Sequence, residues 1–205
     1  MKCLLSQSEA SNTYLIERFD QVYLVDPSHN YEEIHQLLEG KKLMGILLTH
    51  GHIDHTILIN RFNCPVYLHE DELELLFDDQ INGSQMLGIK REFKKSTLDL
   101  RLIKDGTIIE LVDRQIIVLH TPGHTRGSVC YKIGDDLITG DTLFKGSIGR
   151  TDFPGGSIRS MKESLKKIFA TSNSLVKIYP GHDEISTIKE EMKHNEYYLK
   201  WVKLN

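Results

Sequence analysis

The chain has 205 residues, a formal net charge of −4 and a sequence pI near 6.2. Nucleic-acid-binding domains usually carry a basic face, so this acidic balance argues against nucleic acid as a partner. The length predicts one domain, and no apolar stretch approaches the ~20 residues of a membrane span.

The cysteines and the first residues point to the cytoplasm. Cys3, Cys64 and Cys130 are odd in number and lack the spacing of a zinc ribbon, so we expect buried or partly buried thiols in a reducing compartment. Residues 1–11 hold one lysine and a three-residue apolar run, which is too little for a secretory signal.

Hydrophobic periodicity predicts an alternation of strands and helices in the first half of the chain. Short strands are expected first, then a helix that ends at Gly40, a buried strand, a short helix, a strand and a further helix. In chain order these elements are 2–5, 13–17, 22–25, 31–38, 43–48, 54–61, 66–68 and a helix that buries Leu73, Leu76 and Phe77.

The second half repeats the alternation and ends in one predicted helix that carries Ile188, Met192, Leu199 and Val202. Before it we expect strands and one amphipathic helix at 108–111, 115–119, 129–133, 137–139, 158–169 and 176–179. Two β-rich halves, each flanked by helices, predict two sheets that pack face to face with helices outside.

Residues 78–99 show the weakest pattern and leave two interpretations open. The basic run 90–95 is either part of a solvated loop, as charge runs usually are, or part of a mobile flap that attracts an anionic substrate.

The densest group of metal-ligand side chains is residues 50–55, His-Gly-His-Ile-Asp-His, directly after the predicted strand 43–48. Imidazole and carboxylate groups are the usual nitrogen and oxygen ligands of zinc, iron and manganese. His50 and His52 are spaced to grip one ion, whereas Asp54 and His55 are displaced along the chain and are placed to grip a second.

Three more strands end in the same way, with a glycine and then one histidine or aspartate. His124, Asp141 and His182 follow the predicted strands 115–119, 137–139 and 176–179. Glycine allows the tight turns that such positions need. Any one of these motifs is weak evidence, but four in one chain predict a metal centre.

These residues together resemble the ligand set of the metallo-β-lactamase fold superfamily. Within it, residues 121–128 (TPGHTRGS), 140–144 (GDTLF) and 149–156 (GRTDFPGG) resemble the small glyoxalase II-like, or hydroxyacylglutathione hydrolase-like, enzymes. The resemblance runs from about Tyr14 to His182 and implies a four-layer αβ/βα sandwich.

The resemblance also implies a role for each ligand. His50, His52 and His124 would hold one divalent ion and Asp54, His55 and His182 a second, with Asp141 and a hydroxide bridging the two. Zinc is the first expectation, with iron or manganese as alternatives. Asp54 would also orient the hydroxide that attacks the substrate.

The implied activity is hydrolysis of a small-molecule thioester, such as an S-acyl derivative of a small thiol. Arg150 stands where relatives have a lysine and could hold a substrate carboxylate, although an internal ion pair with Asp152 is the alternative. A mononuclear-iron persulfide dioxygenase and a lactone hydrolase remain alternatives. Metallo-β-lactamases proper commonly lack the bridging aspartate, which disfavours antibiotic hydrolysis.

One departure from the resembled enzymes concerns domain organisation. Full-length glyoxalase II carries a C-terminal helical domain that holds glutathione. We expect residues 1–205 to form a single metallo-β-lactamase-fold domain without it. This departure leaves two alternatives open, a different thiol carrier or a different thioester. The sequence does not indicate an oligomeric state.

Overall fold

The computed structural model describes residues 1–6 and 8–204, so residues 7 and 205 of the predicted domain lie outside the described residues. The chain divides into two compact units. The first comprises Met1–Ile103 with Glu110–Asp113, and the second comprises Lys104–Ile109 with Arg114–Asn205.

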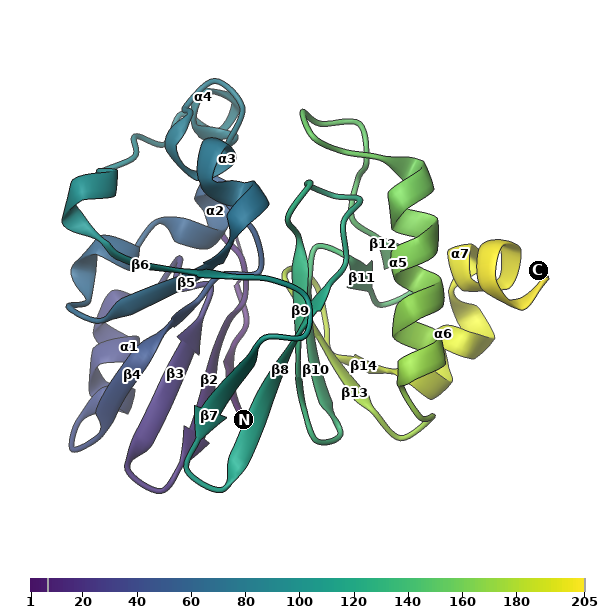
Figure 1. Cartoon of the computed structure of the whole chain (residues 1–205), viewed down its shortest axis with the longest axis horizontal. Helices are drawn as coiled ribbons and strands as arrows, with labels where there is room; N and C mark the ends of the chain where they lie inside the picture. The colour runs from purple at the N-terminus through teal and green to yellow at the C-terminus, as the bar shows by residue number, and fades with distance from the viewer. Residues whose placement is uncertain (7, 205) are drawn as a thin grey trace. The chain divides into compact units, whose positions relative to one another are not determined.

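The first unit contains a six-stranded sheet in which the strands follow each other in chain order (Figure 1). The first three strands pair antiparallel, and β3, β4, β5 and β6 pair in parallel. The strands are β1 (Lys2–Leu4), β2 (Thr13–Arg18), β3 (Gln21–Val25), β4 (Lys42–Leu47), β5 (Pro65–His69) and β6 (Asp99–Ile103).

Short helices connect these strands. They are α1 (Tyr31–Leu38), α2 (Ile53–Thr56), η1 (Ile59–Arg61), η2 (Glu70–Glu72), α3 (Leu73–Phe77), α4 (Ser84–Leu87) and η3 (Lys95–Thr97). The central parallel strands are nearly continuous apolar runs because such strands are covered on both faces. Leu24 of β3, Ile46 of β4 and Leu68 of β5 meet Ile34 of α1 in one core cluster.

The predicted helix 54–61 is wrong as a single element. Thr56 turns its hydroxyl back to the carbonyl oxygens of His52 and Ile53, at 3.1 and 3.4 Å, and so competes for helical acceptors. The amide of Leu58 then bonds the Pro27 carbonyl at 3.0 Å instead of continuing the helix. The segment therefore splits into α2 and η1.

The second six-stranded sheet has the order β14-β13-β10-β9-β8-β7, and its strands belong to the second unit except for the last two residues of β7. Helix α5 (Ile158–Thr171) buries Met161, Leu165 and Ile168, and the Ser157 hydroxyl caps its start. The strands are β7 (Ile108–Leu111), β8 (Arg114–His120), β9 (Val129–Ile133), β10 (Asp136–Gly140), β13 (Lys177–Pro180) and β14 (Ser186–Thr187), and β11 (Leu143–Phe144) and β12 (Ser147–Ile148) form a separate hairpin.

The predicted single C-terminal helix is also wrong. Helix α6 (Ile188–His194) ends at Asn195, whose side-chain oxygen accepts the amides of Tyr197 and Tyr198. This cap starts α7 (Glu196–Tyr198), and a π-helical turn, η4 (Leu199–Lys203), follows. The sequence pattern also missed β6, an edge strand with a mostly exposed face, and the two-residue strands β11, β12 and β14.

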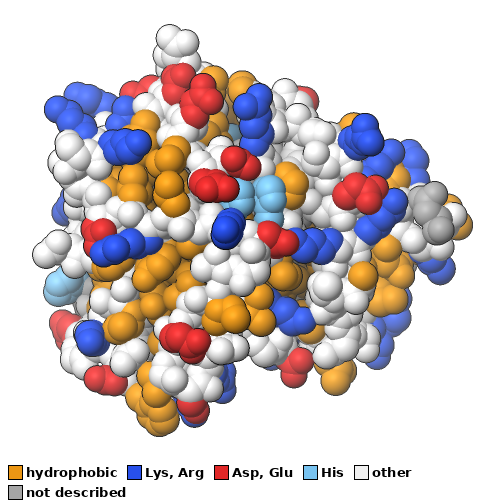
Figure 2. All heavy atoms as spheres, viewed as in Figure 1, with side chains coloured by type: hydrophobic (Ala, Val, Ile, Leu, Met, Phe, Trp, Pro, Cys, Tyr) orange, Lys and Arg blue, Asp and Glu red, His pale blue; other side chains and the backbone are white. Residues whose placement is uncertain are grey.

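The surface carries charges of both signs. On the face shown in Figure 2, basic and acidic side chains are interspersed, unlike the one-sided basic surface typical of nucleic-acid binding. Among residues 1–6 and 8–204, every helix falls short of the length and apolarity that crossing a membrane requires.

The core of the first unit predicts a large effect of one truncation. Leu24→Ala should lower the free energy of unfolding by about 2–5 kcal/mol, because Leu24 is fully buried and its removal leaves a cavity. Leu102→Ala, at a side chain that is 52% exposed, should change it by about 0.5 kcal/mol or less. Urea unfolding followed by circular dichroism measures both, and equal losses would contradict the assigned core.

Candidate metal centre

In the first unit, three parallel strands end at the same edge of the sheet, and polar residues follow each end. Asp26 follows β3, residues 49–55 follow β4, and Glu72 follows β5. The carboxyl ends of parallel strands are common positions for ligand sites in α/β proteins. The structure thus gathers His50, His52, Asp54 and His55 at this edge.

The carboxylate of Asp26 holds the histidine turn. Asp26 is 1% exposed and has a left-handed backbone, with φ of 48°. Its Oδ1 accepts the Thr49 amide at 2.8 Å, and its Oδ2 accepts the Thr49 hydroxyl at 2.6 Å. The same Oδ2 lies 2.9 Å from His55 Nδ1. Such a buried carboxylate needs these donors, because an unpaired one would be costly.

These contacts determine which ring nitrogens remain available to a metal. His55 Nδ1 donates to Asp26, which leaves the lone pair on Nε2. Thr49 has a single hydroxyl proton and gives it to Asp26, so its oxygen accepts from His50 Nδ1 at 3.1 Å. His50 then also presents Nε2 as a base. A carboxylate or hydroxyl behind the ring is the usual support of a metal-ligating histidine.

The spacing of the ring nitrogens fits a shared ion. His50 Nε2 and His52 Nδ1 are 3.0 Å apart, and the two rings are nearly perpendicular at 87°. Two nitrogens bound to one zinc at about 2.1 Å would be separated by roughly 3.0–3.4 Å. His55 Nε2 and Asp54 Oδ2, the candidate pair for a second ion, lie 3.7 Å apart. The donor set therefore suits divalent metal ions.

In the second unit, β8, β10 and β13 run in the same direction. Strand β9 is antiparallel to both β8 and β10, and β10 is parallel to β13. His124, Asp141 and His182 follow these three strands. The register pairs Gly140 with Pro180, and the Gly181 amide bonds the Gly140 carbonyl at 2.9 Å. Residues 141 and 182 meet for this reason, although they are far apart in sequence.

One oxygen of Asp141 faces both histidines. Asp141 Oδ2 lies 3.5 Å from His124 Nε2 and 3.7 Å from His182 Nε2. His124 Nδ1 donates to the main-chain carbonyl of Arg150 at 2.8 Å, which leaves Nε2 as the base on the side of Asp141. A single carboxylate oxygen between two imidazole nitrogens is the arrangement that a bridging ligand requires.

Two glycines permit this arrangement. A Cβ on Gly149 would lie 1.8 Å from the Asp141 carbonyl oxygen, so only glycine lets the 149–156 loop approach Asp141. Gly123 has φ of 148°, and a Cβ there would lie 2.6 Å from Met161 Cα. The chain before His124 therefore lies directly against α5.

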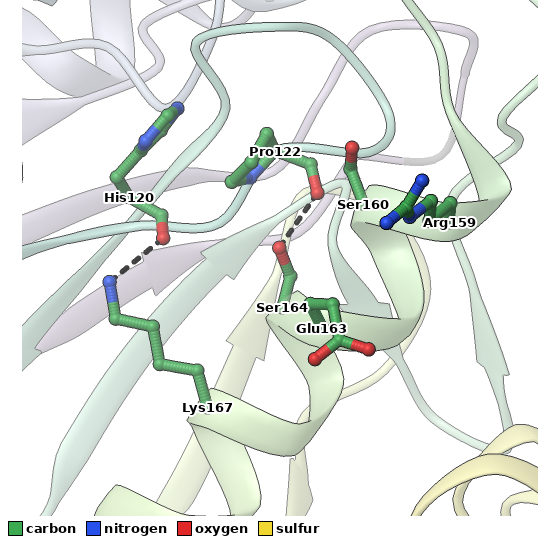
Figure 3. Close-up of a pocket in the computed structure, with 7 residues that line it drawn as sticks. All are labelled: His120, Pro122, Arg159, Ser160, Glu163, Ser164 and Lys167. Atoms are coloured by element: carbon green, nitrogen blue, oxygen red, sulfur yellow. Dashed lines mark hydrogen bonds between the residues drawn. The ribbon is translucent and has the colours of Figure 1, made fainter.

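Helix α5 also holds that chain by its side chains. Ser164 donates to the Pro122 carbonyl at 2.7 Å, and Lys167 donates to the His120 carbonyl at 3.0 Å (Figure 3). A pocket of about 280 Å³ adjoins these contacts. Lys167 is paired with Asp105 at 2.6 Å, and the pocket also contains Glu163, so its charges are balanced and we assign it no ligand.

Arg150 forms the internal ion pair that the sequence left open. Its Nε and one Nη each donate to the Asp152 carboxylate at 2.8 Å, and the guanidinium stacks 3.6 Å from the ring centre of Phe153. Pairing with Arg150 lowers the pKa of Asp152 to about 2. The role of Arg150 in substrate binding stays a prediction.

The cysteines are thiols, as expected. Cys130 is buried and Cys3 and Cys64 are partly buried, and burial raises the pKa of each to about 11. Cys130 lies 3.3 Å from the Thr121 hydroxyl. A thiol with this pKa stays protonated at neutral pH and is a poor nucleophile.

Part of the basic run 90–95 belongs to the core of the first unit. Phe93 is buried and packs edge-on against Phe77, with 6.1 Å between ring centres. Arg91 donates to Asp79 at 2.7 Å and to the carbonyl oxygens of Phe77 and Phe93. Lys94 and Lys95 are exposed. A mobile flap in residues 78–99 stays a prediction.

Sequence reasoning missed the groups that hold the ligands. These are Asp26, Thr49, Glu72 and the carbonyl of Arg150. Asp26 and Glu72 carry a signal that could have found them, because each follows a predicted strand as the metal motifs do. The Arg150 carbonyl carries none, since every residue has one.

The chain is similar to known proteins over most of its length. The family model of the metallo-beta-lactamase superfamily matches residues 8–182. The probable metallo-hydrolase YqgX of Bacillus subtilis (strain 168) is 34% identical over 196 residues, which cover 91% of this chain and 92% of that protein.

Three solved structures are similar over nearly the whole chain. The BLEG-1 B3 metallo-beta-lactamase is 32% identical, with a TM-score of 0.84 and coverage of 96% of this chain and 98% of that one. TTHA1623 in a di-iron-bound form is 30% identical, with a TM-score of 0.81 and coverage of 96% and 100%. ETHE1 from Myxococcus xanthus is 27% identical, with a TM-score of 0.75 and coverage of 95% and 82%.

The Arg150–Asp152 pair predicts a pH dependence. The Asp152 carboxylate should titrate near 2 in the folded protein, because the adjacent guanidinium favours the charged form. A lowered folded pKa means that the pair stabilises the fold above the ordinary value of 3.8 and that this contribution is lost as the pH falls toward 2. Arg150→Gln should return the midpoint toward 3.8. Carboxyl carbon NMR titration measures both, and an unchanged midpoint would refute the pairing.

Proposed function

Because the chain belongs to the metallo-beta-lactamase superfamily, we propose that it is a metallo-hydrolase that acts on a thioester of a small thiol. The fold class predicted from the sequence is confirmed by this membership and by the two sheets with their helices. The metallo-hydrolase part agrees with the name of the Bacillus subtilis relative, a probable metallo-hydrolase. The thioester part is carried by the resemblance of residues 121–128, 140–144 and 149–156 to glyoxalase II-like enzymes.

The seven candidate ligands would serve two divalent ions. As the resemblance implies, one ion would take His50, His52 and His124, and the other would take Asp54, His55 and His182, with Asp141 shared. Asp141 Oδ2 facing the Nε2 atoms of both His124 and His182 is the observation that carries the dinuclear proposal. The 3.0 Å spacing of His50 Nε2 and His52 Nδ1 and the di-iron form of TTHA1623 support it.

If bound, two such ions would lower the pKa of a water held at the site toward neutrality and would polarise a substrate carbonyl. The residues of this chain then have distinct tasks. Asp54, whose side chain is 16% exposed and whose Oδ2 lies 3.7 Å from His55 Nε2, would accept a hydrogen bond from that water and orient it. Asp26, Thr49 and the Arg150 carbonyl accept hydrogen bonds from the Nδ1 atoms of His55, His50 and His124 and so fix the orientation of three rings.

Arg150 could bind a substrate only if its guanidinium interacts with the substrate and with Asp152 at the same time, or releases Asp152. The side chain is about half exposed and already engages Asp152 in two hydrogen bonds. A substrate carboxylate would have to compete with Asp152 or add to the pair from the solvent side. We therefore propose a modest contribution of Arg150 to affinity for anionic thioesters.

Persulfide oxidation and β-lactam hydrolysis are two alternative activities that a panel of substrates can distinguish from thioester hydrolysis. The likeness to ETHE1 is compatible with a mononuclear-iron persulfide dioxygenase, and the likeness to BLEG-1 brings β-lactam hydrolysis into the comparison. The metal-loaded protein should be tested on acyl thioesters of several thiols, on lactones, on a chromogenic cephalosporin and for oxygen uptake with a persulfide. Fastest turnover of thioesters supports the proposal, and oxygen uptake without thioester hydrolysis would overturn it.

The metal stoichiometry is the first prediction of this function. Saturating reconstitution should give close to two transition ions per chain, and Asp141→Ala should weaken both sites because that side chain is shared. Elemental analysis and chelator titration measure the two quantities. A single ion in the wild-type protein, or one unaffected site in the variant, would refute the ligand assignment.

The second prediction concerns the nucleophile. Asp54→Asn keeps the side-chain size but removes the charge, and turnover should fall about a hundredfold or more, in the range of general-base and ligand losses. Cys130→Ser should leave turnover nearly unchanged, because the Cys130 thiol is buried and protonated. Steady-state kinetics at matched metal content measures both, and an inactive but folded Cys130→Ser protein would favour a covalent mechanism instead.

A further inference from the structure

Glu72 is a buried carboxylate next to the histidine turn. It ends the short helix η2, in which Glu70 and Asp71 are exposed, but Glu72 itself is 1% exposed. Burial of a carboxylate is costly unless strong hydrogen bonds compensate. The Oε2 atom of Glu72 accepts the amide of Gly51 at 2.7 Å, a short charge-assisted bond.

Gly51 stands between two candidate ligands of one ion. Its amide belongs to the peptide group that joins His50 to Gly51. A hydrogen bond to this amide therefore restrains the orientation of that peptide plane and of the turn between His50 and His52. The turn also lies close against α3, because a Cβ on Gly51 would be 3.0 Å from the Leu76 amide nitrogen and 3.3 Å from Glu72 Oε2. Glu72 and the backbone of α3 at Leu76 therefore support the turn.

The support from Glu72 is separate from that of Asp26. Asp26 acts on Thr49 and on the ring of His55, and through the Thr49 hydroxyl on the ring of His50. Glu72 acts on the main chain between His50 and His52. His50 Nε2 and His52 Nδ1 lie 3.0 Å apart, and Gly51 is the single residue between the two histidines in the sequence.

We infer that Glu72 is a positioning residue for the first metal ion, holding the Gly51 peptide so that His50 Nε2 and His52 Nδ1 converge. The inference rests on the proposed metal-binding function. The competing explanation is that Glu72 only stabilises the fold of the first unit. The two explanations differ in whether the histidine pair or the whole unit responds to loss of the carboxylate.

The test compares three variants. Glu72→Leu removes the acceptor, Glu72→Gln keeps an oxygen that can accept the Gly51 amide, and Glu70→Gln removes an exposed charge on the same short helix as a matched control. Zinc affinity is measured by chelator competition. Glu72→Leu should weaken the site of the first ion about 10–100-fold, as loss of an outer-shell partner does. Glu72→Gln should recover most of the affinity, and Glu70→Gln should match the wild type.

A second measurement needs no metal. Nitrogen-15 NMR of the imidazole rings in the metal-free protein should show altered His50 and His52 signals in Glu72→Leu, with the His55 signal unchanged because Asp26 still holds that ring. A wild-type protein that binds none of zinc, iron and manganese would refute the proposed function, while this NMR comparison would still decide the role of Glu72.

Three results would overturn the inference. They are unchanged His50 and His52 signals in Glu72→Leu, a shift of all three histidines together with a lower unfolding midpoint, and a failure of Glu72→Gln to recover affinity. The second result would mean that Glu72 is only structural. If Glu72→Leu does not fold, Glu72→Ala takes its place, because it also removes the acceptor of the Gly51 amide. A positioning role predicts changed His50 and His52 signals in Glu72→Ala, and unchanged signals in Glu72→Gln and Glu70→Gln.

Discussion

The buried carboxylate of Asp26 is the contact on which the histidine turn depends. It is acceptable inside the first unit because three donors satisfy it, two from Thr49 and one from His55. These bonds also determine the tautomers of His50 and His55, since each Nδ1 becomes the donor and each Nε2 the base. One carboxylate thereby ties the end of β3 to the turn after β4 and prepares two rings for a cation.

The second unit reaches the same result with a main-chain carbonyl. His124 Nδ1 donates to the Arg150 carbonyl, and this carbonyl lies in place because Gly149 lets the loop lie against Asp141. The 149–156 loop therefore has a structural role that does not depend on any substrate. The Arg150 side chain adds to this role, because its pairing with Asp152 and stacking on Phe153 hold the loop at the surface.

Both units thus orient their candidate ligands before any ion binds. Each histidine whose Nδ1 is hydrogen-bonded has a fixed ring orientation, so binding an ion would require little reorganisation of these rings. The glycines are part of the same arrangement, because Gly51, Gly123 and Gly149 stand where a Cβ would meet backbone atoms at 3.0 Å or less. The proposed hydrolysis therefore depends on the orientation of the histidine rings and on the close turns at these glycines.

The sequence by itself determined the fold class, and it showed that each motif with candidate ligands follows an apolar strand, which is also the order of elements in the structure. The tertiary structure decided the support of the ligands and the breaks in the helices. His55 is bonded to Asp26, His124 to the Arg150 carbonyl, Gly51 to Glu72, and the Leu58 amide to the Pro27 carbonyl. Local periodicity reports only which face of a strand or helix is apolar, whereas these bonds join residues that are distant in sequence and form only once the sheets have brought them together.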